Sequence, residues 1–216
     1  MSTEDLLPLP PDEKIPQIKP IYASLVAGSV LLRLSSFKHS GSLFNPMGPA
    51  NRFDCHPVGP YQAHDSAFGV CYLGSTLKSC IAATCLSSYQ TGHSVNGHLD
   101  SSRMVVRVEV TEGLDLLDLS GDGPLMAGTR MGILDEYQKR SITQEWARRF
   151  YLNPFGEYQP IDGIRWLSAK NREMVYVLYA RAHNKVKIIR KAGVLDKSLR
   201  TEVMRICRDY RIVIDG

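Results

Sequence analysis

Apolar residues along the chain recur in short blocks, separated by segments rich in glycine, proline and polar residues. Blocks of this length, dominated by β-branched and aliphatic residues, are typical of strands. Strands are predicted at 30–34, 68–73, 104–110, 114–119 and 212–214. Two further blocks, 174–180 and 185–190, are predicted to form an antiparallel pair joined across His183-Asn184.

Three segments carry apolar residues at helical spacing instead. The first is predicted to begin at Ser75 or Thr76, with Leu77, Ile81 and Cys85 on one stripe. The second is predicted to begin at Ser141-Ile-Thr-Gln144, which has the form of a capping box. The third is predicted to span 196–210.

The strands are not regularly interleaved with helices, which favours an α+β domain built on a single curved antiparallel or mixed sheet. We expect this domain to occupy 21–216. Residues 1–20 contain five prolines and are predicted to form an extended arm, a disordered tail rather than a docking peptide. The segment 35–67 is long and punctuated by glycine and proline, and such a loop is uncommon in a compact domain unless it builds a site.

Composition narrows the function further. The net charge is only +4, and the Lys and Arg residues are spread along the chain, which argues against direct nucleic-acid binding. No apolar stretch is long enough to span a membrane, and the first residues lack the pattern of a signal peptide, so we expect a cytoplasmic protein. The five cysteines and six histidines show no metal-ligand spacing, which predicts reduced thiols and no metal site. Neither GxGxxG nor GxxxxGK[ST] occurs.

Several motifs follow one another in an order that resembles the RES domain family, named for its Arg, Glu and Ser. They are Arg33 in the first strand, Asn51-Arg52-Phe53 in the long loop, Tyr72 near the end of the next strand, Trp146-Ala147, and Asp162-Gly-Ile-Arg-Trp-Leu-Ser168 before an apolar strand. The resemblance covers roughly Val30 to Tyr179.

This resemblance implies a fold related to ADP-ribosyltransferases and an activity on NAD. Members of the family act as intracellular toxins that split NAD at the nicotinamide glycosidic bond, with water or phosphate as acceptor, or that transfer ADP-ribose to a protein. It also implies a partner, either an antitoxin, often one with a helix-turn-helix domain, or an immunity protein. No cofactor beyond the substrate NAD is implied.

The chemistry of the matching residues fits this activity. Arg33 and Arg52 can bind the pyrophosphate through two-pronged hydrogen bonds. Tyr72 offers a flat face to nicotinamide, and Ser168 can hydrogen-bond ribose or phosphate. Each residue also has a structural alternative: a salt bridge for Arg33, solvation for Arg52, core packing for Tyr72 and a turn or cap for Ser168.

Ala83 stands where the family places its glutamate. A carboxylate there would stabilise the positive charge that develops on ribose during cleavage, and alanine cannot. Alanine in a helix needs no special explanation, so one alternative is that nothing is missing. Otherwise the member is naturally inactive or a glutamate was replaced on purpose, and the intact Arg33, Arg52, Tyr72 and Ser168 favour deliberate replacement.

The sequence thus predicts an NAD glycohydrolase or phosphorylase toxin whose present form lacks the catalytic acid. One alternative is a mono-ADP-ribosyltransferase that modifies a cytoplasmic protein. Another is an inactive module that holds a nucleotide or a partner without chemistry.

Overall fold

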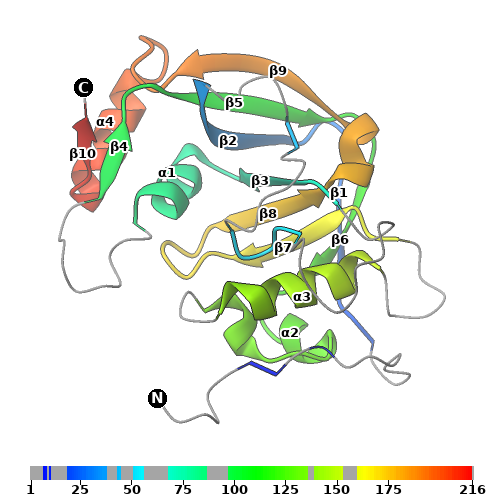
Figure 1. The fold of residues 1–216 in the computed structure, drawn as a ribbon. Coiled ribbons are helices and arrows are strands. Elements are labelled where there is room, and N and C mark those ends of the chain that lie inside the picture. Colours follow the sequence, from blue (N-terminus) through cyan, green and yellow to red (C-terminus); the bar gives the residue numbers. More distant parts are fainter. Residues whose placement is uncertain are drawn as a thin grey trace.

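A computed structural model describes residues 7–8, 10, 19–37, 43–44, 51–55, 68–86, 97–135, 139–152 and 160–215 of the chain. Within these residues the chain forms one strongly curved eight-stranded sheet, in the order β1-β6-β7-β8-β3-β2-β5-β9, and a small parallel pair, β10-β4 (Figure 1). Neighbouring strands of the large sheet are antiparallel except for β6 and β7. The predicted fold class, α+β with a mixed curved sheet, is confirmed.

The strands are β1 (Tyr22–Leu25), β2 (Val30–Ser36), β3 (Val70–Gly74), β4 (His98–Asp100), β5 (Arg103–Val110), β6 (Leu114–Asp118), β7 (Gly163–Leu167), β8 (Met174–Tyr179), β9 (Val186–Gly193) and β10 (Val213–Asp215). The helices are α1 (Leu77–Cys85), α2 (Gly123–Met126), α3 (Arg140–Tyr151) and α4 (Arg200–Tyr210), with 3-10 helices at Met131–Leu134 and Ala180–Lys185. None of these described helices has the length and hydropathy needed to cross a membrane.

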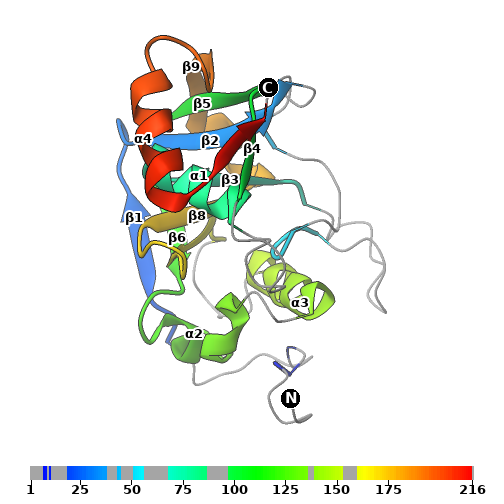
Figure 2. The same ribbon diagram turned by 90° about the vertical axis from the view of Figure 1, so that its left-hand side faces the viewer.

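Helices cover the curved sheet at two places. The helices α1 and α4 pack together against one end of β2 and β5, beside the β4–β10 pair (Figures 1 and 2). The predicted stripe of Leu77, Ile81 and Cys85 is buried in this contact, as the helical spacing indicated. The helix α3 buries Trp146 and Phe150 against β7, β8 and the segment 51–55. Between these two groups of helices lies a cavity that residues of both α1 and α3 line.

Two predictions about the elements were wrong, and strand β7 beside the site was not predicted. Strands β8 and β9 do not pair, because β8 lies between β3 and β7 while β9 pairs with β5, and a 3-10 helix connects them. Helix α3 begins at Arg140 without a side-chain cap, so Ser141-Ile-Thr-Gln144 is not a capping box. Strand β7, within 162–168, was not predicted, because its alternation is broken by Arg165.

The first residues of the chain depart from the predicted tail. Leu7 is buried in the core under α3, and the indole nitrogen of Trp146 donates a hydrogen bond to the carbonyl of Pro8 at 2.8 Å. These two residues therefore dock against the domain. Most of the remaining positions of 1–20 lie outside the described residues.

Candidate active site

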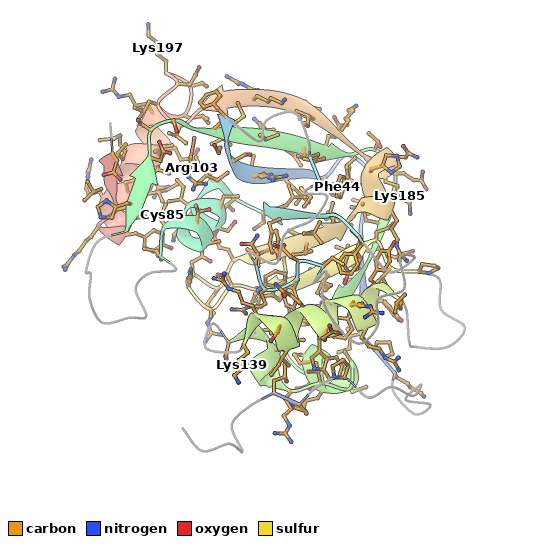
Figure 3. The ribbon with its side chains drawn as sticks, in the orientation of Figure 1. Phe44, Cys85, Arg103, Lys139, Lys185 and Lys197 are labelled. Carbon is orange, nitrogen blue, oxygen red and sulfur yellow. The ribbon has the colours of Figure 1, made fainter. Side chains whose placement is uncertain are left out.

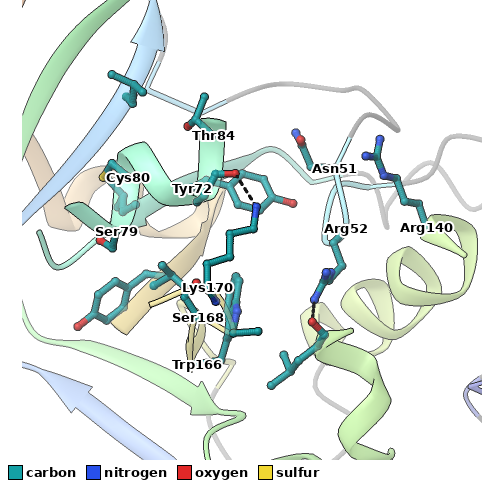
Figure 4. Close-up of a pocket in the computed structure, with 18 residues that line it drawn as sticks. Asn51, Arg52, Tyr72, Ser79, Cys80, Thr84, Arg140, Trp166, Ser168 and Lys170 are labelled. Carbon is teal, nitrogen blue, oxygen red and sulfur yellow. Dashed lines mark hydrogen bonds between the residues drawn. The ribbon is translucent and has the colours of Figure 1, made fainter. Parts of the chain in front are cut away.

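A cavity of about 290 Å³ opens where helix α1, strand β3, the turn between β7 and β8, and the segment at Asn51-Arg52 converge (Figure 4). The described residues that line it come from six separate stretches of sequence: Leu34, Asn51, Arg52, Tyr72, Leu73, Gly74, Ser79, Cys80, Ala83, Thr84, Leu134, Arg140, Trp166, Ser168, Ala169, Lys170, Val175 and Tyr176. Four of the five site residues predicted from the sequence, Arg52, Tyr72, Ala83 and Ser168, are among them.

Arg33 is the predicted site residue that does not line this cavity as described. Its guanidinium donates a hydrogen bond to the carbonyl of Leu43 and lies 3.6 Å from the sulfur of Cys71. Because neighbouring side chains of a strand point to opposite faces, Arg33 lies on the other side of β2 from Leu34, which does line the cavity. No carboxylate of the described residues forms an ion pair with Arg33, so the salt-bridge alternative is not what the structure contains.

Helix α3 holds the Asn51-Arg52 segment in place. The Thr143 hydroxyl donates to the carbonyl of Arg52 at 2.8 Å, and the Gln144 amide donates to the carbonyl of Asn51 at 2.8 Å. Both side chains are buried, and they point from the first turns of the helix to the loop. The Arg52 guanidinium itself donates to the carbonyl of Leu134 (Figure 4). The long loop therefore contributes to a site, as expected, because buried polar side chains fix its backbone.

Tyr72 presents its ring to the cavity and its hydroxyl to the segment 51–55. The hydroxyl oxygen accepts a hydrogen bond from the backbone N–H of Phe53 at 2.9 Å. Burial and the nearby Asp54 carboxylate raise the pKa of Tyr72 well above its usual value, so the phenol keeps its proton. The ring is therefore available for stacking, while the hydroxyl is engaged in holding the loop.

Ser168 lies at the start of the turn that joins β7 to β8. Its backbone N–H donates to the carbonyl of Glu173 at 2.9 Å, and its hydroxyl oxygen accepts from the N–H of Lys170 at 3.3 Å. The turn closes at Arg172, which adopts a left-handed conformation with φ of 58°. Ser168 therefore fits the structural alternative of a turn serine, and its buried side chain also faces the cavity.

Ala83 lies on the last turn of α1, with its side chain exposed at the rim of the cavity. The ammonium of Lys170 reaches across the cavity to this turn and donates a hydrogen bond to the carbonyl of Ala83 at 3.4 Å (Figure 4). A glutamate at position 83 would therefore place its carboxylate in the same region as a lysine ammonium.

The charged side chains among the described residues that line the cavity are all positive. Arg52, Arg140 and Lys170 line it, whereas none of the described lining residues is Asp or Glu. Such a lining attracts phosphate and other anions. Arg140 and Lys170 were missed at the sequence level, because an exposed cation in a helix or a turn carries no signal of what it faces. Trp166, which contacts Phe53 edge-on at 5.1 Å between ring centroids, was noted only as part of a motif.

Cys80 is the one thiol among the described lining residues. Its sulfur donates to the carbonyl of Leu32 at 3.1 Å, and burial raises its pKa to about 12. A protonated, hydrogen-bonded thiol is a poor nucleophile. The arrangement therefore offers anion binding, an aromatic surface and a serine hydroxyl, but neither a thiolate nor a carboxylate.

Comparisons with known proteins agree with the fold. A family model described as the RES domain matches residues 31–200. Among solved structures, the chain is similar to one in the crystal structure of the M. tuberculosis MbcT–MbcA toxin–antitoxin complex. The TM-score is 0.53 and the identity 14%, over 82% of this chain and 92% of the other. At that identity the likeness concerns the fold alone. No curated protein matches the chain.

Proposed function

Since the chain belongs to the RES domain family, we propose that its cavity binds NAD and that the form with a glutamate at position 83 cleaves the nicotinamide glycosidic bond. The observation that carries this proposal is the convergence of Arg52, Tyr72, Ser168 and position 83, from four distant segments, on one cavity. Residues that meet in this way without packing against one another as a core are typical of a binding site.

The dimensions and charge of the cavity suit one end of NAD. Its volume of about 290 Å³ is near the lower limit of small-molecule sites, which hold roughly 300–1,000 Å³. We assign the nicotinamide and its ribose to this space, with the aromatic rings of Tyr72 and Trp166 beside the nicotinamide. The pyrophosphate would then lie against the guanidinium groups of Arg52 and Arg140. Arg33, on the other face of β2, donates a hydrogen bond to the carbonyl of Leu43, and we assign it no direct contact with NAD.

Position 83 decides whether bound NAD reacts. Glycosidic cleavage develops positive charge on the ribose carbon as the bond to nicotinamide breaks. In the present chain, the nearest described charge to this position is the Lys170 ammonium, which repels such a transition state. A carboxylate at position 83 would reverse the local field, and Lys170 would keep that carboxylate ionised by lowering its pKa. Loss of one carboxylate thus removes the chemistry and leaves the binding residues in place.

The test is the release of nicotinamide from NAD by three forms of the full chain: the chain itself, Ala83→Glu and Ala83→Gln. Glutamine fills the same space as glutamate without the charge, so it is the matched control. We expect turnover with Ala83→Glu alone, and measurement with and without phosphate identifies the acceptor as water or phosphate from the product. Equal rates for Ala83→Glu and Ala83→Gln, or no turnover by any form, would contradict the proposal.

The biological role that follows is a toxin held in check by a cognate partner. Family membership and the likeness to a chain from a toxin–antitoxin complex support this role. We place its action in the cytoplasm, where five cysteines outside any disulfide are stable. Induced expression of Ala83→Glu should arrest growth and deplete cellular NAD, whereas Ala83→Gln should do neither. Modification of a single protein without NAD depletion would instead favour mono-ADP-ribosyl transfer.

A second candidate is a module that binds NAD or a related nucleotide without chemistry. The observation that favours it is the absence of Asp and Glu among the described residues that line the cavity. Saturable NAD binding by Ala83→Glu with no turnover, under conditions where the protein is folded, would favour this candidate over the enzyme.

A further inference from the structure

A second hollow, of about 250 Å³, lies on the same side of β2 as the first cavity but at the start of helix α1. The first cavity meets α1 at Ser79, Cys80, Ala83 and Thr84, whereas the second meets it at Leu77. Strands β2, β5 and β9 form its base, and the start of α4 forms one wall (Figure 1). Its apolar lining consists of Val30, Leu32, Leu77, Val105, Ala192 and Leu199.

Two arginines border this hollow side by side. Arg107 of β5 and Arg190 of β9 are direct partners across the antiparallel ladder, so both side chains point to the same face of the sheet. Like charges in that relation destabilise a sheet. Arg190 donates a hydrogen bond to the Ser198 hydroxyl at 2.8 Å. The side chain of Arg107 forms no hydrogen bond or ion pair with any described residue.

A β-bulge creates this arginine pair. The register of β5 and β9 shifts between Arg107 and Val108, because Val108 faces Ile188 while Arg107 faces Arg190. Ile189 is the extra residue, and without the bulge it would stand opposite Arg107. Bulges redirect side chains and are often found beside functional sites. The chain therefore places two guanidinium groups together where a regular ladder would place an isoleucine beside an arginine.

The balance of charge and shape limits what could bind. Glu202 is the one acid among the described residues that line the hollow, so the lining carries two positive charges and one negative. No aromatic side chain is among them to stack on a base. A nucleotide with several phosphates suits this lining poorly. A single carboxylate suits it well, because a guanidinium binds a carboxylate through two parallel hydrogen bonds.

We propose that this second hollow binds a carboxylate attached to a small aliphatic group, with the carboxylate between Arg107 and Arg190 and the aliphatic group on the apolar base. Such a ligand could be a free short-chain acid or the last residue of a polypeptide, which share this chemistry. The site is separate from the NAD cavity and does not depend on the function proposed for it.

The test is a calorimetric or NMR titration of the full chain with N-acetyl-leucine. N-acetyl-leucinamide, which lacks the carboxylate, and N-acetyl-glycine, which lacks the aliphatic group, are the matched ligands. We expect saturable binding of N-acetyl-leucine, and binding at least tenfold weaker for each of the other two. Binding that is equal for the acid and its amide, or no binding of the acid at low millimolar concentration, would overturn the proposal.

Two variants locate the binding. Arg107→Gln should weaken it at least tenfold, and Ala192→Phe should abolish it by filling the hollow while both arginines remain. Arg130→Gln is the control, because Arg130 is also an exposed arginine without a described partner and does not line the hollow. Unchanged affinity in Arg107→Gln and Ala192→Phe would refute this location.

Two further probes distinguish a free small acid from the end of a polypeptide as the ligand. A leucine-terminated hexapeptide that binds tighter than N-acetyl-leucine indicates a polypeptide end. A free 4-methylpentanoate that binds at least as well as N-acetyl-leucine, with no gain from the peptide, indicates a small acid.

Discussion

The two ends of helix α1 differ in the groups that meet them. At its start, the Thr76 hydroxyl accepts from the N–H of Ser79 and donates to the carboxylate of Glu173, and the Ser79 hydroxyl completes a capping box. At its end, Ala83 offers only a carbonyl, and the charged group that meets it is the ammonium of Lys170. The same turn between β7 and β8 supplies both Glu173 and Lys170.

We therefore assign the start of α1 to the stability of the fold and the end of α1 to binding and reaction. A helix start whose donors and acceptors are all paired contributes to stability. The last turn of α1 borders the cavity, and the Lys170 ammonium that meets it there can contact a bound anion. We therefore expect substitutions at the start to change folding and substitutions at the end to change binding and reaction.

The largest effect should come from closing the space at the start of α1. A Cβ on Gly74 would lie 2.2 Å from the Ser79 hydroxyl oxygen and 2.9 Å from the Cys80 sulfur. Gly74→Ala should therefore destabilise the fold by about 2 kcal/mol, in the range for overpacking. Gly113→Ala, where nothing lies within 4 Å of the added carbon, is the control and should be near neutral. Urea unfolding measures both, and equal midpoints would refute the role given to Gly74.

The next effect concerns position 83, at the end of α1. In the Ala83→Glu background, Lys170→Met should raise the pKa of the new carboxylate, since a neighbouring cation lowers it. The acid limb of the pH–rate profile should then move to higher pH. Lys197→Met is the control, because Lys197 is exposed and projects from the top of the molecule in Figure 3, and it does not line the cavity. A limb that does not move would show that Lys170 does not act on position 83.

The third effect removes the cap. Thr76→Val keeps the shape of the side chain but removes the hydroxyl that joins Ser79 and Glu173, and should cost about 1 kcal/mol. Asp122 also precedes a helix but makes no side-chain cap, so Asp122→Ala should change stability much less. Hydrogen exchange of the α1 amides and urea midpoints measure the difference. Comparable losses in the two variants would contradict the assignment of the cap.

The smallest effect concerns the ion pair between Arg165 and Asp118. Arg165 donates to the carboxylate of Asp118 at 2.6 and 2.9 Å. Partial burial acts to raise the pKa of Asp118, but the hydrogen bonds from Arg165 and Ser120 outweigh it and hold the pKa below its usual value. A lowered folded-state pKa stabilises the fold above the unfolded-state pKa and loses that effect as pH falls through the folded-state pKa.

Asp118→Asn should accordingly cost less than about 1 kcal/mol near neutral pH, because the pair is partly exposed. The difference from the unsubstituted chain should shrink as the pH falls below about 4, the ordinary pKa of an aspartate. Urea unfolding across this range tests the sign. A difference that grows on acidification would contradict it.

The sequence was informative where local pattern decides structure. The stripe of Leu77, Ile81 and Cys85 predicted α1, and the apolar blocks predicted β2, β3, β5 and β6 to within a few residues. Prediction failed where contacts between residues far apart in the sequence determine the structure. Strands β8 and β9 are neighbours in the chain but four places apart in the sheet order, because other strands offer each of them a partner. Docking of Leu7 and Pro8 depends on Trp146, far away in sequence.

The site residues likewise divide into those that the sequence predicted and those that only the fold identifies. Arg52, Tyr72, Ala83 and Ser168 were predicted from the order of motifs, and they meet in one cavity. Lys170 and Arg140 were not predicted, because their role comes from the direction in which a turn and a helix start point. Arg33 was placed with the others from sequence order, yet the pleat of β2 turns it to the other face. Strand position alone does not say which face a side chain occupies.

The most direct test of the central claim, that the cavity holds NAD even without its acid, is a titration of the unsubstituted chain with NAD, alongside Arg52→Gln and Arg130→Gln. We predict saturable binding without turnover, weakened by Arg52→Gln about tenfold or more through loss of a charged hydrogen bond, and unchanged by Arg130→Gln. Absence of NAD binding, or binding that survives Arg52→Gln unaltered, would contradict the account.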